Sequence, residues 1–234
     1  MTERELLEKG LSELLPTVHP QAVDKLMRFS ALLLEKNKVM NLTAITDPME
    51  VVTRHFLDCA ALVPLLKAGE RVLDVGTGAG FPGMPLAILC PETEFVLLDA
   101  LGKRIDFLNE VIADLGLTNC AAVHARAEDF AKEHRGSFDL ATSRAVAELR
   151  VLCELSLPMI KTGGAFLAMK AVDCEDELAA SANARQVLGA GEPERIRYTV
   201  PFDGVERLIV RLPKVSDTPE RYPRRFKKIQ TAPL

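Results

Sequence analysis

The first quarter of the chain carries apolar residues at helical spacing. One stripe begins after Pro20, with members three or four positions apart, which is the repeat of one helix face: Val23, Leu26, Met27, Ser30, Leu33 and Leu34. A second helix is predicted to begin at Asp47–Pro48, because Asp is a favoured N-cap residue and Pro suits the first helical position. We therefore expect residues 3–66 to be helical and to pack on the rest of the chain.

From Arg71 onward the pattern changes to short apolar runs that alternate with helical segments. The apolar runs predict strands over residues 71–75, 95–99, 120–124, 138–143 and 164–170. Helices are predicted between them, around residues 83–89, 102–115, 126–133 and 145–160. Such alternation is typical of a doubly wound, parallel sheet with helices on both faces.

The alternation ends after a predicted helix near residues 173–188. Two further strands, 196–200 and 207–212, are separated by a short loop containing Asp203–Gly204, which predicts an antiparallel hairpin. The expected architecture is a mostly parallel, seven-stranded α/β sheet that ends in this hairpin. We expect three parts: a helical cap over residues 1–68, the α/β core over 69–215 and a basic C-terminal tail over 216–234.

Composition narrows the possible partners and the compartment. The net charge of −4 over 234 residues excludes a generic binder of polyanions, so any nucleic-acid surface must be a local patch. The five cysteines are scattered, with no C-x-x-C pair and no zinc-ligand spacing to the four histidines. We expect reduced thiols, no metal, and a cytoplasmic protein without a signal peptide or membrane segment.

The most informative segment is Asp74–Gly83, a glycine-rich loop between a predicted strand and a predicted helix. It contains G-x-G-x-x-G at Gly78, Gly80 and Gly83, a pattern that lets the backbone approach a nucleotide-like ligand. Asp74 argues against a pyrophosphate, since two negative charges repel strongly in a poorly solvated cleft. A carboxylate facing the ligand suits the ammonium and sulfonium groups of S-adenosylmethionine.

Asp99 ends the next predicted strand, 21 positions after Gly78 and close to the ~20 expected for an acid that binds a ribose hydroxyl. NAD and S-adenosylmethionine both carry such a ribose, and Asp99 could instead cap the helix that starts near Gly102. Further along, Arg126–Asp129 could meet an adenine edge or simply place acids at a helix N-terminus. Arg144 follows the fourth strand, where it could bind a carboxylate or a phosphate or form a structural ion pair.

The segment Arg221–Lys228 has five cations and two aromatic residues in eight positions. Cations bind phosphates and aromatic rings stack on unpaired bases, so this segment is a candidate RNA contact, although charge runs are often only solvated. The predicted RNA-binding residues are Arg54, His55, Lys103, Arg104, Arg221, Arg224 and Arg225.

Several short segments resemble the RsmG (GidB) family of bacterial 16S rRNA methyltransferases. They occur in order from about residue 20 to the end of the chain: Asn41–Ala44, Arg54–Asp58, Asp74–Ala87, Leu101–Arg104, Ser143–Ala145 and Tyr222–Arg225. Five parallel strands plus a hairpin is also the layout of class I (Rossmann-like) methyltransferases. Two features depart from the family pattern: Ala171 stands where many relatives have glycine, and the tail after Arg225 lacks the usual Pro/Gly-rich ending.

The resemblance implies methyl transfer from S-adenosylmethionine to N7 of a guanine in 16S rRNA or the small ribosomal subunit. It adds a contact between Phe81 and the cofactor. Together with the loop, it predicts this cofactor-binding set: Asp74, Gly76, Gly78, Gly80, Phe81, Asp99, Ala100, Leu101, Ala127, Glu128 and Arg144.

N7 of guanine has a free lone pair and no proton to lose, so we assign no acid–base catalyst and expect a monomer without metal. Three other readings stay open from the sequence. A small-molecule methyltransferase would use the helical cap as a lid over its substrate. An NAD-dependent oxidoreductase would bind NADH despite Asp74. A non-enzymatic RNA-binding or assembly factor would bind RNA whether or not the cofactor is present.

Overall fold

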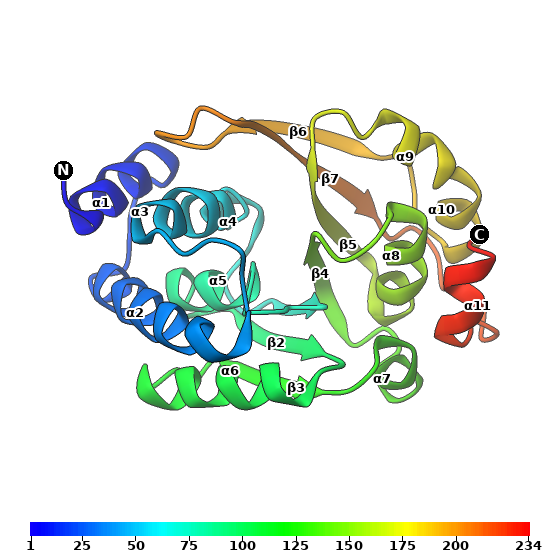
Figure 1. Ribbon diagram of the computed structural model, residues 1–234. Helices are drawn as coiled ribbons and strands as arrows, with labels where there is room; N and C mark the ends of the chain where they lie inside the picture. Colours follow the sequence, from blue (N-terminus) through cyan, green and yellow to red (C-terminus); the bar gives the residue numbers. More distant parts are fainter.

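The structure is a computed structural model that describes residues 1–234. A single sheet of seven strands forms its centre, in the order β3-β2-β1-β4-β5-β7-β6 (Figure 1). The strands are β1 (Arg71–Val75), β2 (Glu94–Asp99), β3 (Cys120–His124), β4 (Phe138–Arg144), β5 (Ile160–Ala171), β6 (Glu194–Thr199) and β7 (Glu206–Pro213). Strands β1 to β5 pair in parallel, and β7 runs antiparallel to both of its neighbours, β5 and β6. The predicted seven-stranded, mostly parallel sheet with a terminal hairpin is confirmed.

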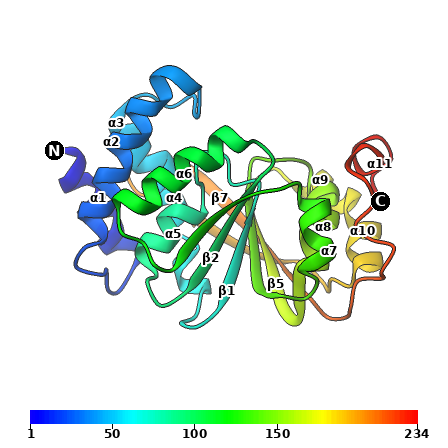
Figure 2. The ribbon, with the colours of Figure 1, turned by 90° about the horizontal axis from the view of Figure 1, so that it is seen from below.

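Helices cover both faces of the sheet (Figure 2). One face is covered by α1 (Glu3–Leu14), α2 (Ala22–Met40), α3 (Pro48–Val51), α4 (Asp58–Ala60), α5 (Gly83–Leu89) and α6 (Gly102–Asp114). The other face is covered by α7 (Ala127–Glu133), α8 (Leu149–Ser156), α9 (Glu175–Ala180), α10 (Ala182–Leu188) and α11 (Phe226–Thr231). Short 3-10 turns span Val63–Leu65 and Leu157–Met159.

Alternate residues of each strand point to opposite faces and feed two separate hydrophobic clusters. Val72 belongs to the cluster under α1–α6, whereas Leu73 belongs to the cluster under α7–α11. The N-terminal helices share one continuous cluster with α5, α6 and the sheet. They therefore pack on the sheet rather than around a core of their own.

Three predicted helices differ from the structure in detail. The helix expected from residue 145 begins at Leu149, because residues 145–148 form a loop in which Ala145 has a φ of 55°. The helix expected over 173–188 is divided at Ser181 into α9 and α10. Asp47 caps α3 as predicted, accepting hydrogen bonds from Met49 N at 2.7 Å and Glu50 N at 3.2 Å, but the helix then widens into a π-helix over Val52–Leu57.

The C-terminal tail is docked on the core. The guanidinium of Arg135 donates hydrogen bonds to the carbonyl oxygens of Thr218 and Tyr222, each at 2.5 Å. Ile229 of α11 is fully buried, and α11 packs against α8 (Figure 1). None of the helices combines the length and the apolar composition that a membrane-spanning segment requires. No group of three or more His, Cys, Asp or Glu side chains is arranged to hold a metal ion.

Candidate functional site

A cavity of about 630 Å³ opens at the carboxyl ends of the parallel strands. Its wall combines the last residues of successive strands with the segments that follow them: Val75–Ala79 at β1, Leu98–Leu101 at β2, Ala125–Glu128 after β3 and Arg144–Val146 at β4. The strand order reverses between β1 and β4, which is where ligands of open α/β sheets bind. The volume lies within the roughly 300–1,000 Å³ of small-molecule sites. Below, this is called the first cavity.

Gly78 shows why the loop after β1 needs glycine. Its φ of 62° lies in the left-handed region, and a Cβ placed there would have no neighbour nearer than the Gly76 carbonyl oxygen at 4.0 Å. The space beside Gly78 is therefore open, and Gly78 lines the first cavity. A side chain at this position would occupy the space available to a ligand.

Asp74 lies elsewhere than expected. Its side chain is fully buried and does not line the first cavity. One oxygen, Oδ2, accepts hydrogen bonds from Thr77 Oγ1 at 2.7 Å and from Gly83 N at 2.8 Å, while Oδ1 has no partner. Burial raises the pKa of this carboxyl to about 6. Asp74 therefore holds the two ends of the glycine loop together from below, which corrects the expectation of a carboxylate facing the ligand.

Gly80 also lies outside the lining of the first cavity. A Cβ at this position would come within 2.8 Å of Leu108 Cδ2, and its φ is 102°. Gly80 thus allows the loop to pack closely on α6. This packing role replaces the ligand contact that the sequence pattern had predicted.

Asp99 is buried at the wall of the first cavity and joins the loops after β1 and β2. Its carboxylate accepts hydrogen bonds from Gly78 N and Leu101 N, both at 2.9 Å, and from Arg104 Nη1 at 3.2 Å. The N-cap of α6 is Leu101, so Asp99 does not cap that helix through its side chain. Arg104, predicted to contact RNA, lines the cavity beside this carboxylate, and its side chain is 38% exposed.

Arg144 lines the first cavity and forms the centre of a polar cluster. Its guanidinium donates to Asp58 Oδ2 at 2.9 Å, to the carbonyl oxygen of Arg54 at 3.1 Å and to His55 Nδ1 at 2.9 Å. It also lies over the ring of Phe81, 4.9 Å from the ring centre. Arg144 thus forms the ion pair that was one of the two readings. It also lines the cavity, so its binding of a ligand carboxylate or phosphate stays a prediction.

His55 is part of the cavity wall rather than an exposed RNA contact. The residue is 8% exposed, and its ring stacks on Phe81 with a centroid distance of 4.1 Å. Burial, with the nearby charge of Arg144, lowers the pKa of His55 to about 3. Because Nδ1 accepts from Arg144, we assign the proton to Nε2, which then donates to Thr43 Oγ1 at 3.0 Å.

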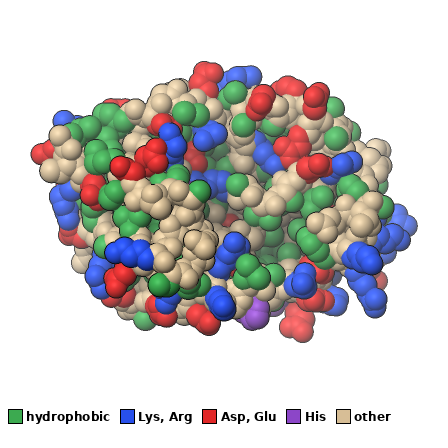
Figure 3. All heavy atoms as spheres, in the orientation of Figure 1, with side chains coloured by type: hydrophobic (Ala, Val, Ile, Leu, Met, Phe, Trp, Pro, Cys, Tyr) green, Lys and Arg blue, Asp and Glu red, His purple; other side chains and the backbone are tan.

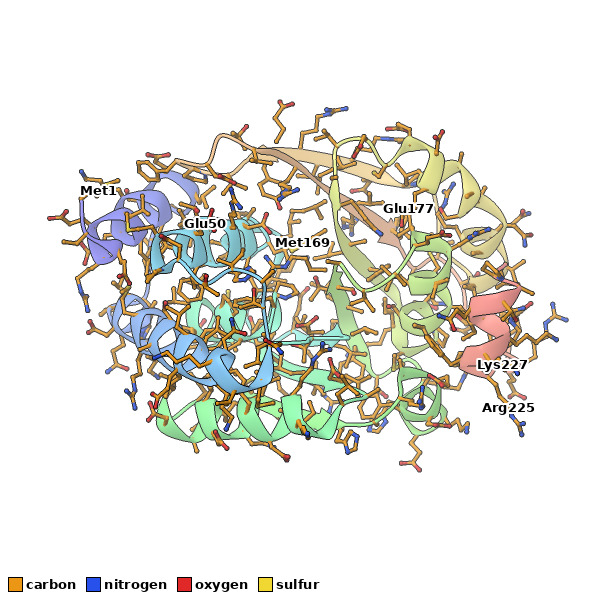
Figure 4. All side chains as sticks on the ribbon, in the orientation of Figure 1. Met1, Glu50, Met169, Glu177, Arg225 and Lys227 are labelled. Atoms are coloured by element: carbon orange, nitrogen blue, oxygen red, sulfur yellow. The ribbon has the colours of Figure 1, made fainter.

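A second cavity of about 490 Å³ adjoins the first. The two share His55, Arg144 and Ala145 in their linings. Met169, near the C-terminal end of β5, lines the second cavity and lies near the middle of the molecule (Figure 4). The space-filling view shows Lys and Arg side chains gathered around the hollow of this face (Figure 3).

Three polar residues that line the second cavity had no role assigned to them from the sequence. Asp58 follows the π-helix, whereas Tyr198 and Arg207 come from the C-terminal hairpin. Tyr198 donates from its hydroxyl to Asp58 Oδ1 at 2.7 Å, and burial together with this carboxylate raises the pKa of the phenol. No local pattern connects residues 140 positions apart, so only the fold reveals this group.

The predicted RNA contacts of the tail separate into two kinds. Arg221 and Arg225 are exposed, and Arg225 points away from the core (Figure 4). Arg224 instead binds Glu154, which is 0% exposed, through Nε at 2.8 Å and Nη2 at 2.6 Å. Phe226 lines the first cavity, a position the sequence did not reveal. Arg224 therefore anchors the tail, and this corrects its assignment to RNA binding.

The strand order and a glycine loop beneath a ligand-sized cavity define a Rossmann-like fold of the class I methyltransferase type. The structure of a SAM-dependent methyltransferase from Aquifex aeolicus is similar, with a TM-score of 0.55, 18% identity, and coverage of 78% of this chain and 98% of that chain. The structure of M. jannaschii TYW2 in complex with AdoMet has a TM-score of 0.54 at 16% identity, covering 68% of this chain and 75% of that chain.

Within this class the chain belongs to one family, described as rRNA small subunit methyltransferase G, whose model matches residues 22–198. The ribosomal RNA small subunit methyltransferase G of Desulfitobacterium hafniense is 46% identical over 205 residues, which cover 87% of this chain and 85% of that protein. The enzyme of the same name from Alkaliphilus metalliredigens is 41% identical over 229 residues, 96% of both chains.

Proposed function

We propose that the protein transfers a methyl group from S-adenosylmethionine to N7 of a guanine in 16S rRNA. The observation that carries this proposal is the first cavity, where the glycine loop, the Asp99 carboxylate and the Ala125–Glu128 segment meet at the strand ends. Membership in a family named for rRNA methylation supports the choice of substrate. We infer further that the substrate is either naked 16S rRNA or the small ribosomal subunit.

The residues present in the first cavity fit the cofactor. The open space beside Gly78 admits a ligand close to the backbone, and Asp99 offers carboxylate oxygens for ribose hydroxyls. Ala127 and Glu128 follow β3, where an adenine edge would lie. Ala100 and Leu101 flank the ribose position, and Gly76 lines the same wall.

Phe81 and Arg144 are assigned to the methionine end of the cofactor. The ring of Phe81 supplies an apolar surface beneath the guanidinium of Arg144, which is placed to bind a carboxylate. Such a contact would compete with the ion pair to Asp58 at 2.9 Å.

When bound, the cofactor supplies a methyl group made electrophilic by the sulfonium sulfur. N7 of guanine needs no deprotonation, so the chain's task is to position this lone pair roughly 3–3.5 Å from the methyl carbon. The stacked rings of His55 and Phe81 keep part of the wall apolar and exclude water. His55 is neutral because its pKa is lowered to about 3, and it places no cation beside the sulfonium.

Each of the three proposed parts of the chain contributes residues to the site. The helical cap, residues 1–68, contributes His55 to the wall of the α/β core, residues 69–215. The tail, residues 216–234, contributes Phe226. Lys103, Arg221 and Arg225 are exposed cations that would bind RNA phosphates, with Arg54 at the second cavity. We infer that the protein acts as a cytoplasmic monomer.

The decisive experiment maps methylation on 16S rRNA. Purified protein and labelled S-adenosylmethionine are incubated with naked 16S rRNA and, separately, with small subunits from cells that lack the protein. Nuclease digestion and mass spectrometry should then identify 7-methylguanosine at one position. Label found only in a small molecule would contradict the RNA substrate, and RNA binding that is indifferent to the cofactor would contradict enzymatic function.

A further inference from the structure

The second cavity lies directly beside the place where the methyl group would be transferred. It shares His55, Arg144 and Ala145 with the first cavity, and these residues form the boundary between the two spaces. A ligand in the first cavity and a ligand in the second can therefore approach each other across this boundary while each stays in its own cavity. The second cavity is therefore positioned to hold the acceptor.

Charge in the second cavity favours an anionic ligand. Four cationic side chains line it, but only one carboxylate, that of Asp58. Three of the cations have carboxylate partners within 3.2 Å. These pairs are Arg144 with Asp58 at 2.9 Å, Lys170 with Glu177 at 2.5 Å, and Arg54 with Glu50 at 3.2 Å.

Arg207 differs from the other three cations. The nearest carboxylate oxygen, Asp58 Oδ1, is 3.9 Å from its Nε, which is too far for a hydrogen bond. That oxygen already accepts a hydrogen bond from Tyr198 at 2.7 Å. Arg207 is 37% exposed and extends from β7, so its base is held by a paired strand. Its planar guanidinium is thus available for a phosphate, which it can bind with two parallel hydrogen bonds.

We propose that the second cavity binds the guanosine nucleotide that accepts the methyl group, and that Arg207 holds its phosphate. This inference rests on the proposed function. Arg207 is a substrate-binding residue. The base then enters from the hairpin side, and N7 meets the methyl group past His55 and Arg144.

The test compares Arg207→Gln with a matched control on the same strand. Arg211 lies on the same face of β7, is 32% exposed and is paired with Glu194 at 2.6 Å, outside both cavities. Methylation of 16S rRNA is measured at several salt concentrations, with calorimetry of S-adenosylmethionine binding. We expect R207Q to raise the KM for RNA by about tenfold or more. The slope of the logarithm of the RNA affinity against the logarithm of the salt concentration should be less steep for R207Q by about 0.7. Cofactor affinity should be unchanged, and R211Q should match the wild type.

Free nucleotides provide a second measurement. Guanosine 5′-monophosphate should inhibit the wild-type enzyme more strongly than guanosine does, and R207Q should abolish the difference. Equal KM values for R207Q and R211Q, or equal inhibition of the wild type by the two compounds, would overturn the assignment of Arg207. A wild-type protein that binds S-adenosylmethionine but methylates no RNA would instead refute the proposed function, so the two failures are distinguishable.

Discussion

Replacing Arg224 with Gln should destabilise the protein far more than the same change at its neighbour Arg225. The Arg224 guanidinium binds both oxygens of Glu154, through Nε at 2.8 Å and Nη2 at 2.6 Å, and Glu154 is 0% exposed. The hydrogen bonds to this carboxylate raise the pKa of Arg224. Arg225 is exposed and is the N-cap residue of α11, without a side-chain cap hydrogen bond.

The magnitude follows from what remains around Glu154. Arg224→Gln removes the guanidinium donors that the tail supplies to the buried Glu154 carboxylate. Of the present hydrogen bonds from the tail, only the one from the backbone N–H of residue 224 remains, which is 2.8 Å long in the protein with Arg224. Removing one partner of a buried ion pair costs about 3–5 kcal/mol, because the other charge stays buried and uncompensated. A surface substitution such as Arg225→Gln should change the free energy of unfolding by less than about 0.5 kcal/mol.

Urea unfolding followed by circular dichroism measures this difference, and limited proteolysis reports whether the tail leaves the core. The double variant Glu154→Gln with Arg224→Gln removes both charges and should recover much of the loss. Phe226 lines the first cavity two residues later, so Arg224→Gln should also weaken cofactor binding. Equal unfolding midpoints for Arg224→Gln and Arg225→Gln would refute the anchoring role.

Three further predictions concern the glycine loop and the buried titratable groups. Gly78→Val should reduce the affinity for S-adenosylmethionine, measured by calorimetry, at least tenfold, which is about 1.4 kcal/mol. Gly116→Val is the control for backbone strain, because Gly116 has a φ of 58°, open surroundings and no contact with the cavity. The pKa of His55 is about 3 in the folded protein and 6.5 in the unfolded chain, so the unfolded chain binds the proton first as the pH falls. The free energy of unfolding should therefore drop as the pH falls from 6.5 toward 3, and His55→Gln should lessen this drop. An unchanged pH profile would contradict a neutral, buried His55. The pKa of Asp74 is about 6 in the folded protein and 3.8 in the unfolded chain, so the folded protein binds this proton more tightly. The free energy of unfolding should therefore decline as the pH rises from 3.8 to about 6. The urea midpoints of Asp74→Asn, measured at several pH values, should lack this decline.

The fold could be predicted closely because its signals are local. A strand buried on both faces must be an apolar run, and turn-forming residues must bound it. The bounds of α5, Gly83–Leu89, match the prediction because a glycine loop precedes it and Pro91 follows it. The position of Asp99 beside the glycine loop was also predictable, since β1 and β2 pair directly, but its 2.9 Å hydrogen bond with Gly78 N was not.

The candidate site was most predictable at the carboxyl ends of the parallel strands and in the short segments just beyond them. Asp99, Ala127 and Arg144 line the first cavity because parallel strands end at one edge of the sheet. Asp74 and Gly80 belong to the same loop, but they turn inward and hold it. The direction in which a side chain points within a tight turn depends on dihedral angles and packing that a spacing pattern does not contain.

The sequence by itself determined the order of strands and helices, the glycine loop and the family, because apolar periodicity and short motifs are properties of neighbouring residues. Tertiary structure alone decided which charges are free. Arg224 and Arg225 are adjacent in a basic segment, yet one is bound to a buried carboxylate and the other is exposed. Likewise, only folding brings Tyr198 to Asp58 and leaves Arg207 without a hydrogen-bonded carboxylate. An ion pair depends on distances in space between distant segments, and these distances exist only once the chain has folded.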